Sequence, residues 1–125
     1  MAGVSLADVE LVRSGFAAVS RGDFDVIAEL LDPDVKWHGG DPDSGCQDRD
    51  ETLAFMRRAM RRTRAQLVDV IDAGDGRVIV VLQPQGDPGD PVLPRRANVT
   101  RLRDGRVVEM VAYETLEDAR AAVGL

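Results

Sequence analysis

The segment 30–40, LLDPDVKWHGG, constrains the fold of this chain more than any other stretch. Helix-like sequence leads into it, and after one further helix the sequence is mostly strand-like. Pro33 disfavours helix at Asp32 and has no backbone N–H to donate, so a helix must end here. Gly39 and Gly40 then open a polar loop. The segment therefore marks the change from a helical half to a strand-rich half.

A short strand is predicted between the proline and the glycines, over residues 35–38. Alternation places Val35 and Trp37 on one face of it. Lys36 and His38 fall on the opposite face. Trp37 is the only tryptophan of the chain and His38 the only histidine.

Two amphipathic helices are predicted before this segment. Apolar residues recur at helical spacing over residues 6–20, at Val9, Val12, Phe16 and Val19. Ser5 and Asp8 have the spacing of a capping box, which predicts the start of this helix. A second helix is expected over residues 24–31, with Asp23 as its N-cap.

A third helix is predicted from Asp48 to about Arg62, again with a capping box, formed by Asp48 and Glu51. One arc of this helix is apolar and holds Leu53, Phe55, Met56, Ala59 and Met60. The opposite arc holds Arg57, Arg58, Arg61 and Arg62. We interpret the arginines as a solvated helix face, because the chain as a whole is acidic.

Four strands follow, over residues 65–72, 77–83, 93–102 and 106–114. Ala73-Gly74-Asp75-Gly76 predicts a turn between the first two, and Asp104-Gly105 predicts a tight hairpin between the last two. A short final helix is expected after Thr115, which forms a cap with Asp118, and Gly124 ends it.

This order of elements predicts one α+β domain over residues 1–125, with helices gathered on one side of an antiparallel sheet. A strongly curved sheet with helices across its hollow face leaves a pocket between them. That pocket is where a ligand would be sought.

The net charge of -6 argues against nonspecific nucleic-acid binding, which depends on neutralising phosphates. Cys46 is the only cysteine, so no disulfide can form within the chain. No signal peptide or membrane span is recognisable, and a soluble cytoplasmic protein with no membrane partner is expected.

Several motifs resemble those of the nuclear transport factor 2-like domains, which include SnoaL-like polyketide cyclases and ketosteroid isomerase-like proteins. Residues 22–25 (GDFD) and 30–37 (LLDPDVKW) resemble the opening of these domains. Residues 48–51 (DRDE), leading to Phe55, resemble the third helix of the family. Residues 104–110 (DGRVVEM) resemble its last hairpin. The similarity covers nearly the whole chain, but this fold carries many unrelated activities.

The resemblance implies a cone-shaped, cystatin-like barrel, in which a curved antiparallel sheet wraps around the N-terminal helices. It also implies an apolar pocket for a small apolar molecule. The side chains expected in this pocket are Phe16, Val35, Trp37, Met56, Met60, Ala97, Val99, Arg101, Val108, Met110 and Ala112, beside Gly39. Family members often form homodimers through the outer sheet face, and here Val107, Val111 and Tyr113, together with Val68 or Val70, are expected on that face.

The same alignment removes the chemistry of the steroid isomerases. That reaction requires a carboxylate base and two acidic donors to an oxyanion. The base falls near Gly39 and the donors near Gly15 and Ala97, whose side chains cannot exchange a proton. The Asp-Arg-Asp set of the family's epoxide hydrolases has no convincing match either.

His38 is a candidate acid or base because imidazole titrates near neutral pH. Its strand parity favours instead a histidine on the surface or at a dimer interface. With Cys46 and the nearby Asp41, Asp43 and Asp48 it could suggest a metal site, but the spacing matches no tight ligand pattern. We expect no metal and no cofactor.

Asp69 lies among apolar strand residues and would be a plausible general base if it faced the pocket. Facing outward, it would be an ordinary edge-strand acid, which we favour slightly. Arg101 would then either pair with Asp69, hold an anionic ligand, or be a solvated arginine. Tyr113 has outward parity and is expected to pack at an interface.

Three hypotheses for function follow. The first is a small-molecule-binding domain with an apolar pocket and no established catalysis. The second is a SnoaL-like isomerase, cyclase or hydrolase that acts on a polyketide, steroid or terpenoid and uses Asp69, Arg101 or His38. The third is a structural dimerisation module, whose pocket would be filled by its own side chains.

Overall fold

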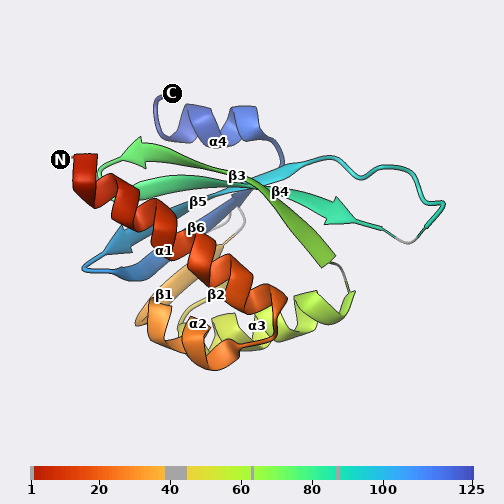
Figure 1. Cartoon of the computed structure of the whole chain (residues 1–125), viewed down its shortest axis with the longest axis horizontal. Helices are drawn as coiled ribbons and strands as arrows, with labels where there is room; N and C mark the ends of the chain where they lie inside the picture. Colours follow the sequence, from red (N-terminus) through yellow and green to blue (C-terminus); the bar gives the residue numbers. More distant parts are fainter. Residues whose placement is uncertain (1, 39–44, 63, 87) are drawn as a thin grey trace.

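The computed structural model describes residues 2–38, 45–62, 64–86 and 88–125, with side chains described for residues 7–38, 45–59, 65–86 and 88–125. The elements, in chain order (Figure 1), are α1 (Ala2–Ser20), α2 (Phe24–Leu30), β1 (Leu31–His38), β2 (Gly45–Cys46), α3 (Arg49–Arg62), β3 (Arg64–Gly74), β4 (Arg77–Gln85), β5 (Arg96–Arg103), β6 (Arg106–Tyr113) and α4 (Leu116–Ala122).

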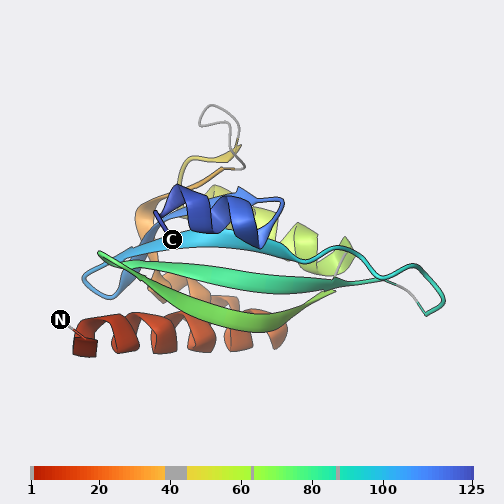
Figure 2. The same ribbon diagram turned by 90° about the horizontal axis from the view of Figure 1, so that it is seen from above.

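The six strands form one open sheet in the order β2-β1-β6-β5-β4-β3. Strands β3 to β6 are joined as antiparallel hairpins, whereas β1 runs parallel to β6. Figure 2 shows α1 on one face of the sheet and α4 on the other. The predicted α+β fold is confirmed, although the sheet is mixed rather than purely antiparallel.

The change from helix to strand occurs where Pro33 predicts it, but the strand begins earlier than expected. Leu31 already has an extended backbone and pairs with Val107. Asp32 Oδ1 accepts a hydrogen bond from the backbone N–H of Asp34 at 2.9 Å, which forms a local turn. Regular pairing with β6 resumes only at Lys36, so the proline lies in an irregular part of β1.

The predicted capping boxes have different outcomes. At α3, Asp48 Oδ1 accepts from the backbone N–H of Glu51 at 2.9 Å, and Glu51 Oε2 accepts from the backbone N–H of Gln47 at 2.8 Å. This start is confirmed. At α1 the prediction is wrong, because the helix begins at Ala2 and Ser5 lies within it. Asp23 occupies the N-cap position of α2 without a side-chain cap bond.

Both predicted tight turns have the geometry that their residues favour. Asp75 and Gly76 have φ of 55° and 74°, and Asp104 and Gly105 have φ of 54° and 78°. Positive φ at both central residues is characteristic of type I′ turns, which match the twist of hairpin strands. The Asp-Gly pairs therefore set the registers of the β3–β4 and β5–β6 hairpins.

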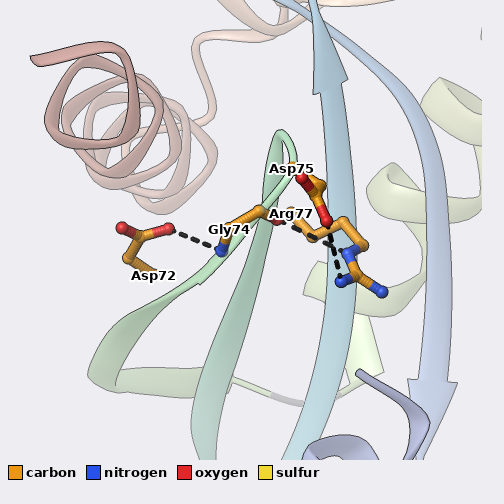
Figure 3. A network of polar contacts seen from close by, with 4 residues as sticks. All are labelled: Asp72, Gly74, Asp75 and Arg77. Atoms are coloured by element: carbon orange, nitrogen blue, oxygen red, sulfur yellow. Dashed lines mark hydrogen bonds and ion pairs between the residues drawn. The ribbon is translucent and has the colours of Figure 1, made fainter. Parts of the chain in front are cut away.

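Polar contacts surround the β3–β4 turn (Figure 3). Asp72 Oδ1 accepts from the backbone N–H of Gly74 at 2.8 Å, and the Arg77 guanidinium lies 3.7 Å from Asp75 Oδ2. Arg77 Nε also reaches the Gly74 carbonyl at 3.5 Å. These contacts connect the two ends of the turn.

The core consists of two layers separated by the sheet. Strand β4 shows both, because Val78 and Val80 pack into the layer beneath α1 and α2, and Ile79 and Val81 into the layer beneath α4. All four residues are at most 5% exposed. A strand buried on both faces is apolar throughout rather than alternating, which explains the run of residues 78–81.

The outer face of the sheet is covered in part by α4. Ala119 of this helix is fully buried in the same cluster as Val99, and Tyr113 packs against that cluster. Val107 was predicted to lie on this outer face, but it is buried in the inner layer. The reason is a register shift opposite Leu102, which turns Val107 and Met110 to the same side. Within the described residues, no helix is long and apolar enough to cross a membrane.

The first prediction concerns the N-cap of α4. The Thr115 hydroxyl accepts from the backbone N–H of Asp118 at 3.1 Å. Thr115→Ala should lower the free energy of unfolding by about 1 kcal/mol, because an N-terminal donor loses its partner. Thr115→Ser keeps the oxygen and is the matched control. Urea denaturation followed by circular dichroism measures both, and equal midpoints for the two variants would exclude a contribution of the cap.

Candidate functional site

A cavity of about 590 Å³ lies between the inner face of the sheet and helices α1 to α3. The helical side is formed by Val12, Gly15, Phe16, Val19, Ser20, Ile27, Leu30, Met56 and Ala59. The strand side is formed by Leu31, Trp37, Ala65, Val80, Leu82, Gln85, Asn98, Thr100, Val107 and Met110. The lining is therefore mainly apolar, with a few amide and hydroxyl groups.

Trp37 is held in the cavity wall by contacts on several sides. It pairs across the sheet with Met110 of β6 and with Cys46 of β2. Its ring meets Phe55 of α3 edge to face, with centroids 4.8 Å apart. Gly45 makes the approach of β2 possible, because it has φ of 139° and a Cβ there would lie 2.1 Å from the Trp37 carbonyl oxygen.

Four of the side chains expected in the pocket line the cavity: Phe16, Trp37, Met56 and Met110. Val35 is fully buried in the core cluster behind them and is not part of the lining. The side chain of Met60 lies outside the described residues.

On β5 the observed lining is offset by one residue from the expected one. Asn98 and Thr100 line the cavity, whereas Ala97 and Val99 belong to the cluster beneath α4. Arg101, with the same parity as Val99, is exposed. Both faces of β5 are covered, so hydrophobicity does not distinguish them, and here the polar residues face the cavity.

On β6 the expected positions also differ from the lining. Val108 lies within the register shift, and Val107 takes its place at the cavity. Ala112 lies opposite Asn98 but is exposed and not part of the lining. A bulge cannot be located by counting alternate residues, which explains the difference.

The Asn98–Thr100 pair is a polar part of the lining that was not expected from the sequence, as were several apolar lining residues such as Val80 and Leu82. Thr100 is buried, and its hydroxyl donates a hydrogen bond to Asn98 Oδ1 at 2.7 Å. The pattern Ala97, Asn98, Val99, Thr100 contained a signal, since it places two polar residues on one face and two apolar residues on the other. The packing of α4 against the apolar face identifies the polar face as the inner one.

Asp69 lies outside the cavity lining, on the edge strand β3. Its side chain is 56% exposed, and its Oδ1 is 3.8 Å from the Arg13 guanidinium and accepts from the backbone N–H of Val70 at 2.8 Å. Neither Asp69 nor Arg101 therefore reaches the cavity, and the structure does not bring the two together at one site.

His38 also lies away from the cavity. Its Nε2 is 3.4 Å from Glu109 Oε2, and its side chain is 17% exposed. Its Nδ1 is buried and has no hydrogen-bond partner within the described part of the chain. Alternation along β1 separates it from Trp37, and no lining residue of the cavity contacts it through a described hydrogen bond.

The cavity carries no charge in its described part, since none of its described lining residues has an ionisable side chain. Gly15 lies in the lining, Ala97 faces α4, and Gly39 falls outside the described residues. Burial raises the pKa of the nearby Cys46 thiol, which keeps it protonated and unreactive near neutral pH.

Among the described residues, no group of three or more histidine, cysteine, aspartate or glutamate side chains is arranged to hold a metal ion. Asp41 and Asp43, which were considered with His38 as ligands, lie outside the described residues.

Comparisons with known proteins place this geometry in a family. The family model of the SnoaL-like domain matches residues 12–110. No significant match is found among curated proteins.

Solved structures share the fold. Bal32a, from a soil-derived mobile gene cassette, is 25% identical, with 92% of this chain and 94% of that chain covered and a TM-score of 0.76. A nuclear transport factor 2-like protein of unknown function from Burkholderia pseudomallei is 21% identical over 95% and 98% of the two chains, with a TM-score of 0.68. A putative polyketide cyclase from Xanthomonas campestris is 25% identical over 94% and 97%, with a TM-score of 0.65.

The matched region includes residues 12–20 of α1, the whole of α2, α3 and β1 to β5, and residues 106–110 of β6, and thus every described residue of the cavity lining. The chain belongs to the family of SnoaL-like domains and has the nuclear transport factor 2-like fold.

Proposed function

We propose that this domain binds a small, uncharged and largely apolar molecule in the cavity between the sheet and α1 to α3. The observation that carries the proposal is the uncharged lining of a cavity of about 590 Å³. This volume falls within the range of small-molecule sites, which are also mainly apolar with a few polar groups. A charged ligand would lose its hydration there without gaining a partner of opposite charge.

The alternative of a SnoaL-like enzyme has less support. Some solved relatives are named polyketide cyclases, but proton transfer requires a titratable group within hydrogen-bond reach of the substrate. The three candidates, Asp69, Arg101 and His38, all lie off the described lining. The remaining alternative, a structural dimerisation module, requires an interior filled by the protein's own side chains, and the size of the cavity argues against it. The homodimer and the cytoplasmic location stay predictions.

Filling part of the cavity should weaken ligand binding without unfolding the protein. Val80 is buried on the inner face of β4 and lines the cavity. Val80→Phe should weaken the binding of the uncharged fluorescent probe N-phenylnaphthylamine at least about tenfold, because the ring occupies the ligand's space. The dissociation constant is measured by fluorescence titration, and folding by circular dichroism.

Val68→Phe is the matched control for this substitution. Val68 is 39% exposed on β3 and does not line the cavity, so the probe affinity should not change. An unchanged affinity in Val80→Phe, with the fold intact, would place the bound probe elsewhere and contradict the proposal.

Binding should be independent of pH between about pH 5 and pH 9. No described lining residue gains or loses a proton, and the probe is uncharged over this range. Titrations at several pH values should give one dissociation constant within about twofold. A tenfold change within this range would show that an ionisable side chain reaches the ligand and would contradict the uncharged site.

Asp69→Asn should leave probe affinity unchanged and alter the free energy of unfolding by no more than about 0.5 kcal/mol. The ion pair with Arg13 is exposed, and asparagine retains the Oδ1 that accepts from Val70. Chemical denaturation and probe titration test both statements. A selective loss of affinity would place the Asp69 carboxylate at the ligand.

A further inference from the structure

Four side chains in the described cavity lining carry an amide or a hydroxyl group: Ser20, Gln85, Asn98 and Thr100. Ser20 and Gln85 are exposed, at the C-terminal ends of α1 and β4. Thr100 is buried and Asn98 is half-buried, both on β5. The lining thus has two exposed polar side chains at the ends of elements and a separate polar pair within β5.

The surroundings of this inner pair are apolar. Asn98 lies opposite Val80 on β4, and Thr100 lies opposite Met110 on β6. Both neighbours line the cavity themselves. A polar group in such surroundings must be paired or it lowers stability, so its hydrogen bonds indicate what it can offer a ligand.

The hydrogen bonds of the pair leave one group unused. The Thr100 hydroxyl donates to Asn98 Oδ1 at 2.7 Å, which fixes the orientation of the amide and occupies its acceptor. The amide nitrogen, Nδ2, carries two N–H donors. No partner for it is found within the described residues. Asn98 therefore presents hydrogen-bond donors to the cavity, and Thr100 holds them in place.

We infer that the ligand is an uncharged molecule, mostly hydrocarbon, with an acceptor oxygen such as a ketone or ester carbonyl, and that Asn98 Nδ2 donates to this oxygen. The inference rests on the proposed function and specifies the ligand class of the same site. A hydrocarbon would leave the donor desolvated and unpaired, whereas a carbonyl satisfies it. Asn98 determines specificity, and Thr100 is a positioning residue.

The test compares two probes of nearly equal shape, fluorene and its ketone fluorenone. Each displaces N-phenylnaphthylamine from the protein, and fluorescence gives both affinities. The unmodified protein should prefer fluorenone about three- to tenfold, which is the range expected for one net hydrogen bond. In Asn98→Leu this preference should disappear through weaker ketone binding, while the affinity for fluorene stays the same or rises.

Gln66→Leu is the matched control, because it removes an exposed amide from β3 that is not part of the cavity lining. It should keep the full preference for the ketone. Thr100→Val should reduce the preference for the ketone, because Asn98 Oδ1 loses its hydrogen-bond donor. Thr100→Ser keeps the hydroxyl and should keep the preference. The ratio of the two affinities is the readout in each case, since a general loss of stability would weaken both probes alike.

The possible failures are distinguishable. Equal affinity for the two probes in the unmodified protein, or a ketone preference that persists in Asn98→Leu, would overturn the inference and leave the proposed function standing. Failure of the unmodified protein to bind either probe, or N-phenylnaphthylamine, would overturn the proposed function itself.

Discussion

The coverage of the sheet on both faces is the constraint on which the rest of the structure depends. The short α4 packs directly on the outer face, where Ala119 fits against Val99 and Ile79. On the inner face a cavity remains between the strands and α1 to α3. One sheet therefore supports a closely packed layer on one side and a binding site on the other. The strand β4, apolar at every position from Val78 to Val81, is common to both layers.

Local chemistry explains which parts of the fold were predictable. The Asp104-Gly105 turn and the Asp48 cap depend on a few neighbouring residues, and both occur where the sequence places them. The two-residue strand β2 depends on a tertiary contact. Strand β2 exists because it pairs with Trp37 and His38, which no local pattern in the loop sequence indicates. The predicted cap at Ser5 was wrong because α1 already begins at Ala2.

On the helices and on β1 the expected and the observed lining overlap only in part, since Val35 is buried in the core and is not part of the lining. Phe16, Trp37 and Met56 all line the cavity. Prediction was poorer on β5 and β6, for two physical reasons. On β5, Ala97 and Val99 pack into the cluster beneath α4, and Asn98 and Thr100 line the cavity instead. On β6, the register shift near Val107 changes which residues face the cavity, so that simple alternation no longer identifies them.

The cavity and its polar pair together describe a site that selects by shape and by one hydrogen bond rather than by charge. A crystal structure of the protein grown with fluorenone tests this account most directly. We predict density for the ketone between Trp37 and Val80, with its oxygen within hydrogen-bond distance of Asn98 Nδ2. An interior closed by the protein's own side chains, with the ketone bound on the surface or absent, would contradict the account.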